Sequence, residues 1–257
     1  MSDHEYERQP RIPDPHRICG SAAVRALFLR RAEDVMRLFY VEERRRDAGP
    51  LCAYLARTRR PYREVLPAEL ARIAGTEHHG GIVAIAALRY AEGLPGHALP
   101  PNLAAAPVLP VLDGIGNPHN LGAIARSCAF FGCKAMVLSD DPRQCDLSDA
   151  AFRTSEGALE HLRVLRARHL PNLLLGMRQK YLTIAAVARD GVPPEALPRD
   201  RPFALVLGNE ESGLPPPTLE ACEARVTLRG SGLVESLNVA AASAVLVHAL
   251  MAGKAGA

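Results

Sequence analysis

Val234-Glu-Ser-Leu-Asn-Val239 leads directly into the apolar run Val239-Ala-Ala-Ala-Ser-Ala-Val-Leu-Val247 close to the C-terminal end of this chain. The change from polar to apolar residues predicts the start of a helix, because Ser236 and Asn238 are good N-cap residues. The backbone N–H groups that stay free in the first helical turn can bind an anion or a carboxylate. Taken alone, the stretch is more typical of a capped core helix than of a site.

A second stretch, Gly208-Asn-Glu-Glu-Ser-Gly-Leu214, follows the apolar residues 204–207. We therefore expect it at the C-terminal end of a strand, where open α/β sheets bind ligands. Gly208 and Gly213 let the backbone approach a ligand or adopt positive φ, although simple turn geometry explains such glycines more often. The chain lacks a Gly-x-Gly-x-x-Gly fingerprint, so an ordinary Rossmann nucleotide site is not indicated.

A third stretch, Asn120-Leu-Gly-Ala-Ile-Ala-Arg126, falls in a helix that the sequence predicts from near Asn120 to Phe131. A buried strand over residues 108–112 precedes it. Asn120 and Arg126 are separated by a little under two helical turns, and this spacing leaves open whether their side chains share a direction. An arginine at such a position is more often a solvated surface residue.

In this order, the three stretches resemble the signature of the SpoU/TrmH family of RNA ribose 2′-O-methyltransferases, within the SPOUT class, over roughly residues 107–252. The resemblance implies a homodimer that binds tRNA or rRNA and a bent S-adenosylmethionine, with no metal. It implies that the catalytic residues are Asn120, Arg126, Glu210, Ser236 and Asn238. It places the cofactor-binding residues at Leu207, Gly208, Asn209, Gly213, Leu228 and Leu237.

The family proposal that the arginine acts as the base meets a physical objection. A guanidinium stays protonated in proteins, so it cannot accept the proton of a ribose hydroxyl. We expect Arg126 to stabilise the developing alkoxide and to bind the adjacent phosphate. Glu210 or an RNA phosphate oxygen would then accept the proton. The resemblance also implies that the first stretch of one subunit approaches the cofactor of its partner.

Strands and helices alternate along residues 107–257, with nearly continuous apolar strands. This pattern predicts a mostly parallel sheet with helices on both faces. Chains in general do not knot, but the resemblance implies a C-terminal trefoil knot formed by residues from about 208 to 253.

A smaller α/β/α domain is predicted over residues 17–92, after a mobile tail over residues 1–16. Ile18-Cys-Gly-Ser-Ala-Ala-Val24 and Glu77-His-His-Gly-Gly-Ile-Val83 resemble the RNA substrate-binding domain found in several SpoU members. Gly80 stands where that family usually has Gln, which puts an RNA contact of this turn in doubt. Residues 93–106 are rich in turn formers and predict an interdomain linker.

A second departure from the family is Leu228-Arg229-Gly230, which replaces the usual Ile-Pro-Met. The change removes bulk and rigidity beside the cofactor loop and adds a positive charge. We therefore expect cofactor affinity or substrate choice to differ from typical members, while the five implied catalytic residues are intact.

The length of 257 residues and the hydrophobic share of 48% predict a protein with a large core. No apolar run is long enough to cross a membrane, so we expect a cytoplasmic protein. The six cysteines show no Cys-x-x-Cys pair, so we expect neither disulfides nor a zinc site. The net charge of +3 is weak evidence for a polyanionic partner. Arginine far outnumbers lysine, which suits phosphate binding but also follows from a GC-rich genome.

Two alternatives to the methyltransferase stay open. One is a non-catalytic RNA-binding or ribosome-assembly protein that keeps the fold, and the absence of S-adenosylmethionine binding would favour it. The other is methylation of a small molecule, for which an arginine-rich N-terminal domain has no obvious use.

Overall fold

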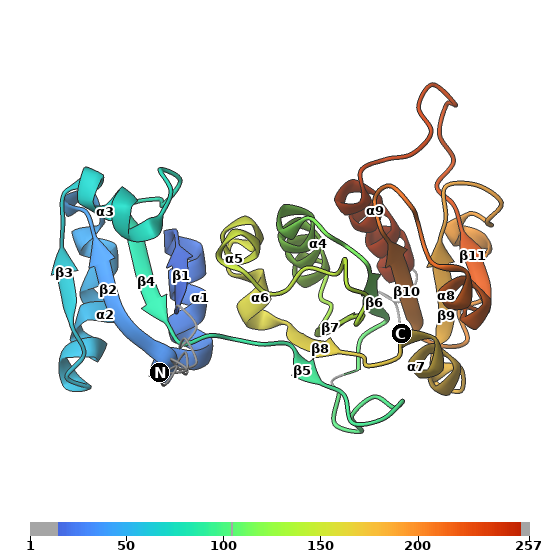
Figure 1. Cartoon of the computed structure of the whole chain (residues 1–257), viewed down its shortest axis with the longest axis horizontal. Coiled ribbons are helices and arrows are strands. Elements are labelled where there is room, and N and C mark those ends of the chain that lie inside the picture. The colour runs from blue at the N-terminus through green and yellow to red at the C-terminus, as the bar shows by residue number, and fades with distance from the viewer. Residues whose placement is uncertain (1–14, 104, 253–257) are drawn as a thin grey trace, which may run out of the picture.

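The computed structural model describes residues 15–103 and 105–252, which form two domains that lie side by side along the longest axis of the molecule (Figure 1). The smaller domain contains a four-stranded sheet in the order β1-β4-β2-β3. Its strands and helices are β1 (His16–Cys19), α1 (Ser21–Arg31), β2 (Val35–Tyr40), α2 (Arg45–Arg57), β3 (Tyr62–Glu64), α3 (Pro67–Ala74) and β4 (Ile82–Ala86).

Helices cover both faces of this small sheet, as predicted. Leu27 of α1 and Leu55 of α2 are buried with Leu38 of β2 on one face, whereas Leu70 of α3 is buried with Val83 of β4 on the other. The tail predicted over residues 1–16 falls mostly outside the described residues, but His16 already belongs to β1.

The larger domain contains a seven-stranded sheet in the order β11-β9-β10-β6-β7-β8-β5, and all of its strand pairs are parallel. The strands are β5 (Glu92–Gly93), β6 (Val108–Asp113), β7 (Ala135–Leu138), β8 (Arg163–Arg166), β9 (Leu182–Ala186), β10 (Phe203–Gly208) and β11 (Ala224–Val226). The helices are α4 (Pro118–Phe130), α5 (Asp149–Ser155), α6 (Ala158–His161), α7 (Leu170–Met177), α8 (Pro216–Ala221) and α9 (Val239–Met251). The predicted parallel sheet is confirmed.

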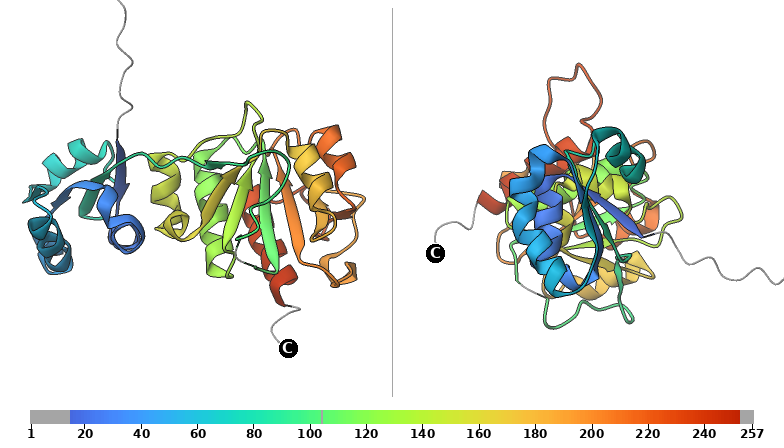
Figure 2. Two further views of the ribbon diagram at one scale, coloured as in Figure 1. Left: turned by 90° about the horizontal axis from the view of Figure 1, so that it is seen from below. Right: turned by 90° about the vertical axis from the view of Figure 1, so that its left-hand side faces the viewer.

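Successive residues of the central strands bury themselves on opposite faces of the sheet, because side chains alternate along a strand. In β10, Leu205 and Leu207 pack with α4, α6 and α9, whereas Ala204 and Val206 pack with α7 and α8. The left view of Figure 2 shows these two helical layers on either side of the strands. This double burial explains why the strands are continuous apolar runs. The implied trefoil knot stays a prediction.

The predicted linker 93–106 needs a correction at its beginning. Glu92 and Gly93 form the edge strand β5, which pairs with β8, and the Leu94 backbone N–H donates to the Arg166 carbonyl over 2.9 Å. The Leu94 side chain is buried in the large domain. The connection between the domains is therefore anchored to the sheet from its first residues.

The residue pattern also predicts one helix from Ala150 to Leu159, and this prediction is wrong, because the segment breaks into α5 and α6. Glu156 and Gly157 both adopt positive φ, of 46° and 92°. A Cβ atom at Gly157 would lie 2.8 Å from the Ala26 Cβ of α1, so the break lets the small domain pack closely on the large one. The two domains consequently share a hydrophobic core, which contains Leu27 of α1 and Leu159 of α6.

Candidate active site

The strand order of the large sheet reverses between β6 and β10, which lie next to each other although β7, β8 and β9 separate them in the sequence. Asp113 ends β6 opposite Gly208, the last residue of β10. Ligands of open α/β folds bind at such a switch point, outside the carboxyl ends of the strands. The loops that follow β6 and β10 therefore mark the candidate site.

The turn after β10 is held by its own hydrogen bonds. Backbone hydrogen bonds of 3.1 and 3.0 Å join Asn209 and Gly213, whose φ is +70°. The Asn209 amide donates to the Gly114 carbonyl over 2.8 Å, and its oxygen accepts from the backbone N–H groups of Glu211 and Ser212 at 3.0 Å. The Asn209 side chain therefore stabilises the turn, and the predicted contact between Asn209 and the cofactor would have to come from the Asn209 backbone.

Three of the predicted catalytic residues meet beside this turn. Asn120 Nδ2 donates to Glu210 Oε1 over 2.6 Å, and Asn238 Nδ2 donates to Asn120 Oδ1 over 3.2 Å. Asn238 also caps α9, because its Oδ1 accepts from the Ala240 backbone N–H at 2.9 Å. The two amides thus join the starts of α4 and α9 to the turn after β10, and the Asn120 amide orients the exposed Glu210 carboxylate.

Arg126 does not join this cluster. Its guanidinium pairs with the Glu156 carboxylate at 3.0 Å, and both side chains are more than half exposed. Six residues at about 100° each place Arg126 roughly 120° around α4 from Asn120. The two predicted catalytic residues therefore face different directions within one chain.

The remaining predicted residues lie along β10 and the loop between β11 and α9, which projects from the body of the large domain (Figures 1 and 2). Leu207 is buried in the core, and Leu228 is half-buried against it. Ser236 and Leu237 are exposed, with 51% of Leu237 accessible. Leu237 directly precedes Asn238, so the hydrogen bond to Asn120 brings this apolar side chain to the same end of the sheet.

Arg143 is a residue that the sequence reasoning missed. Its Nη1 donates to Ser212 Oγ over 2.6 Å, and its Nε and Nη2 donate to the Asp141 carboxylate over 2.9 and 2.7 Å. Arg143 thereby connects the loop after β7 with the turn after β10. Hydrogen bonds from Arg143 lower the pKa of Asp141 from 3.8 to about 2. Arg143 could have been found from the sequence, because it lies in a polar loop that follows a buried strand, where α/β folds place their site residues.

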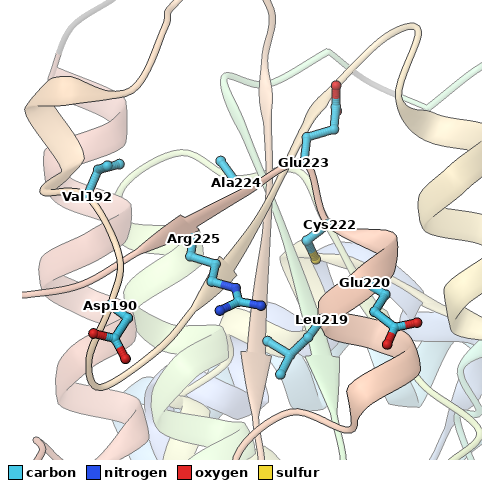
Figure 3. A pocket seen from close by; sticks show the side chains of 8 residues that line it. All are labelled: Asp190, Val192, Leu219, Glu220, Cys222, Glu223, Ala224 and Arg225. Atoms are coloured by element: carbon cyan, nitrogen blue, oxygen red, sulfur yellow. The ribbon is translucent and has the colours of Figure 1, made fainter.

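A separate surface hollow of about 450 Å³ lies beside α8 and β11 (Figure 3). It is lined by Asp190, Val192, Leu219, Glu220, Cys222, Glu223, Ala224 and Arg225. Burial raises the pKa of the Cys222 thiol to about 12, so this cysteine is protonated at neutral pH and is not an activated nucleophile. None of the predicted site residues lines this hollow.

Within residues 15–103 and 105–252, no group of three or more His, Cys, Asp or Glu side chains is placed to hold a metal ion. Among the helices of the same ranges, none has the length and apolarity that a membrane crossing requires.

Two family models match the chain, one for each domain. The model of the SpoU rRNA Methylase family matches residues 107–248, which include all the predicted site residues. A second model, described as RNA 2'-O ribose methyltransferase substrate binding, matches residues 17–91.

Curated relatives are similar over both domains. An uncharacterized tRNA/rRNA methyltransferase, YfiF, of Escherichia coli O157:H7 is 32% identical over 246 residues, which are 95% of this chain and 70% of the relative. An uncharacterized tRNA/rRNA methyltransferase of Haemophilus influenzae is 33% identical over 90% of this chain, which spans 65% of that protein. The 23S rRNA (guanosine-2'-O-)-methyltransferase RlmB of Nitrosomonas europaea is 34% identical over 68% of this chain and 67% of its own length.

Two solved structures share the fold of the whole chain. An rRNA methyltransferase from Sinorhizobium meliloti has a TM-score of 0.74 at 19% identity, covering 94% of this chain and 88% of its own. The SpoU methyltransferase AviRb from Streptomyces viridochromogenes, in complex with AdoMet, has a TM-score of 0.72 at 18% identity, covering 95% of this chain and 91% of its own.

Proposed function

Because the chain belongs to the SpoU rRNA methylase family, we propose that it transfers a methyl group from S-adenosylmethionine to a ribose 2′-hydroxyl of tRNA or rRNA. The observation that carries this proposal is the hydrogen-bonded cluster of Asn120, Glu210 and Asn238 at the switch point of the parallel sheet. In this cluster the Asn120 amide holds the Glu210 carboxylate and Asn238 holds Asn120, at the end of the sheet where α/β folds bind their ligands.

The residues around this cluster fit S-adenosylmethionine. Gly208 has no side chain, and a Cβ atom there would lie 2.6 Å from the Gly213 backbone, so the close approach of the two ends of the turn requires glycine at this residue. Leu228 and Leu237 offer apolar surface for an adenine ring. The Asn209 and Gly213 N–H groups already bond within the turn, so hydrogen bonds to the ring would come from the backbone of residues 207 and 208 and from the second lone pairs of the Asn209 and Gly213 carbonyls. We propose these residues as the cofactor site. When bound, S-adenosylmethionine supplies an electrophilic methyl group.

The ribose hydroxyl must lose its proton as its oxygen bonds to the methyl carbon. Glu210 Oε1 is held by Asn120 Nδ2, which leaves Oε2 of the same carboxylate to accept that proton. The Arg126 guanidinium has five N–H donors, and the ion pair with Glu156 engages Nη2. Its other donors can stabilise the alkoxide and bind the neighbouring phosphate. Ser236, two residues before Asn238, is proposed to border the same site.

Arg126 can act in this way if two copies of the chain share each site. It points about 120° away from Asn120 around α4, so the Arg126 of one copy would reach the cofactor turn of its partner. Phe130 on α4 is 83% exposed and Val245 on α9 is 47% exposed. Covering this apolar surface favours a homodimer formed through α4 and α9.

We propose residues 17–92 as the RNA substrate-binding domain, residues 93–106 as the connection and residues 107–257 as the methyltransferase domain. We also propose a cytoplasmic location, since tRNA and rRNA are found there.

A non-catalytic RNA-binding protein is the second candidate. Arg229 and Gly230, in place of the usual Pro and Met, and the exposure of Leu237 favour it, because they weaken the expected wall of the cofactor site. Calorimetry with S-adenosylmethionine and transfer of a tritiated methyl group to total cellular RNA distinguish the two candidates. Binding together with transfer supports the enzyme, whereas RNA binding without cofactor binding supports the alternative.

A further inference from the structure

A second hollow of about 480 Å³ lies at the junction of the two domains. The small domain contributes Arg30, Arg31 and Arg89 to its lining, and the large domain contributes Lys134, Arg163 and Glu160. Five of these six side chains are cationic, which is unusual for a surface whose chain has a net charge of only +3.

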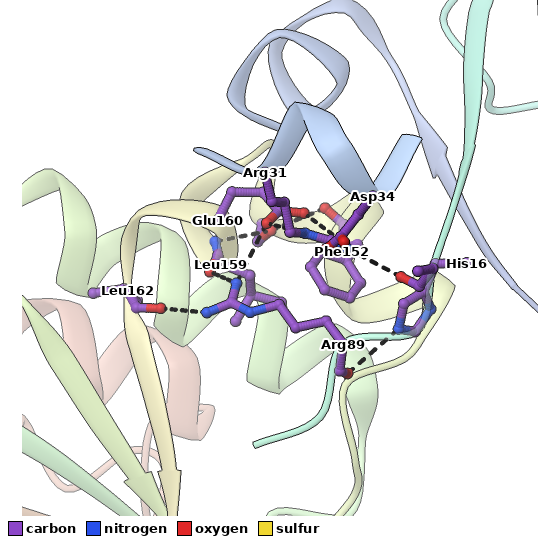
Figure 4. Close-up of polar contacts among 10 residues, drawn as sticks. His16, Arg31, Asp34, Arg89, Phe152, Leu159, Glu160 and Leu162 are labelled. Atoms are coloured by element: carbon purple, nitrogen blue, oxygen red, sulfur yellow. Dashed lines mark hydrogen bonds and ion pairs between the residues drawn. The ribbon is translucent and has the colours of Figure 1, made fainter. Parts of the chain in front are cut away.

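The single carboxylate among them faces away from a ligand. The Glu160 side chain is 1% exposed, and its two oxygens accept from Arg31 Nε and Nη2 over 2.8 and 2.9 Å. Arg89 Nη1 also reaches Glu160 over 3.4 Å, and Figure 4 shows both arginines converging on this carboxylate. Because these bonds already occupy the carboxylate oxygens, Glu160 organises the floor of the hollow and offers little repulsion to an anion.

Positive charge is left over at the mouth of the hollow. Arg163 is neutralised by Glu92, with hydrogen bonds of 2.8 and 2.6 Å. Arg30 and Lys134 are both exposed, and neither forms an ion pair within the described ranges of the chain. Burial lowers the pKa of the Arg89 guanidinium, and Arg31 and Arg30 lower it further, although Glu160 acts in the opposite direction. Arg30 is therefore close enough to add to the positive potential.

The favourable interaction of cations with the C-terminal end of a helix explains only some of the positive charges in this hollow. Arg30 and Arg31 lie in the last turn of α1, where cations stabilise the helix dipole. Lys134 has no such role, because it does not belong to a helix. It directly precedes β7 and so lies at the N-terminal end of the strands, whereas Asn120 and Glu210 lie beyond their C-terminal end. The small domain and the large domain each contribute one exposed cation to the same hollow.

We propose that this interdomain hollow binds backbone phosphate of the RNA substrate, which Arg30 contacts from the small domain and Lys134 from the large domain. This inference rests on the proposed RNA methyltransferase function and adds a path for the RNA along the domain junction, away from the reacting ribose. Phosphate contacts position nucleic acid without reading its sequence. An RNA bound here would also hold the two domains in one relative orientation.

The test compares the wild type with the double variant R30Q/K134Q in binding a fluorescein-labelled RNA hairpin and total tRNA at several salt concentrations. Each lost phosphate contact removes about 0.7–0.9 from the slope of log K against log salt, so the slope should fall by roughly 1.4–1.8. If the two contacts contribute nothing to the affinity at 1 M salt, the same relation predicts a loss of affinity of roughly 25- to 60-fold at 0.1 M salt. The affinity for S-adenosylmethionine, measured by calorimetry, should stay unchanged.

The matched control is R168Q/K180Q, which also removes one arginine and one lysine, both of them exposed. It should keep most of the affinity and the salt slope. An equal loss in the control would mean that only total charge matters, and this would overturn the proposal. An unchanged slope in R30Q/K134Q, with methyl transfer by the wild type intact, would overturn the phosphate site and leave the enzyme function standing.

Inorganic phosphate serves as the final probe, because a free anion has the same chemistry as the RNA backbone. Thermal stabilisation of the wild type by phosphate, lost in R30Q/K134Q while RNA binding is unaffected, would assign the hollow to a free anion and refute the RNA contact. Circular dichroism melting of both variants shows whether they fold, and we expect them to do so because all four substituted side chains are exposed.

Discussion

Glu160→Gln tests how strongly the two domains are joined. The substitution keeps the size of the side chain, but it removes the charge that Arg31 and Arg89 share. One oxygen remains as an acceptor, and the new NH₂ group faces guanidinium N–H donors. The variant therefore buries positive charge without its carboxylate.

The burial of the pair sets the size of the expected effect. The side chains of Arg31 and Glu160 are 10% and 1% exposed, and breaking a buried pair on one side costs about 3–5 kcal/mol. Arg31 keeps hydrogen bonds to Asp34 and to the Ala87 carbonyl, which favours the lower end of that range. About 3 kcal/mol corresponds to a fall in Tm of roughly 6–12 °C for a chain of this length.

Scanning calorimetry of wild type and variant measures this effect. The control is Glu64→Gln, because Arg45 donates to Glu64 with the same two-bond geometry, at 2.8 and 2.8 Å, on the surface. Exposed ion pairs contribute little to stability, so the Tm of this control should hardly change. If Glu160→Gln lowers Tm no more than the control does, the buried network does not stabilise the junction and our reasoning is wrong.

Three further predictions concern the site. Arg126→Ala and Asn238→Ala homodimers should be inactive, whereas co-expressed chains should recover activity in one of the two sites of each heterodimer; a silent mixture of confirmed heterodimers would exclude a shared site. Gly208→Val should weaken S-adenosylmethionine binding at least about 10-fold in calorimetry, because its Cβ meets the Gly213 backbone at 2.6 Å; unaltered affinity would count against this location of the pocket. Arg143→Gln should raise the pKa of Asp141 from about 2 toward 3.8 in an NMR titration, without reaching 3.8, because the backbone N–H of residue 143 still donates to this carboxylate. Since the folded pKa is the lower one, the stability from this carboxylate is present above pH 4 and is lost as the pH falls toward 2; an Asp141 titration that stays near 2 in the variant would show that Arg143 is not the cause.

Sequence patterns sufficed for the features that depend on near neighbours. Residues 204–207 are apolar throughout, and the structure buries them alternately on the two faces of β10, as the geometry of a strand requires. Asn238 was expected to cap the last helix, and its side chain accepts the hydrogen bond from Ala240. The turn 208–213 was expected at the end of a strand, because glycines follow an apolar run there. In each case the cause lies within a few residues of the effect.

Only the tertiary structure decided which distant side chains meet. Arg31 and Glu160 are 129 residues apart, and no local pattern distinguishes them from other charged residues on helices. The break between α5 and α6 depends on the close approach of α1, so a reading of residues 150–159 alone predicts one continuous helix. Arg126 pairs with Glu156, which lies in the turn between α5 and α6, and the spacing along α4 alone did not predict this contact. Local patterns determine which segments become strands, helices and turns, whereas the site and the domain junction arise from contacts that form only when those segments pack together.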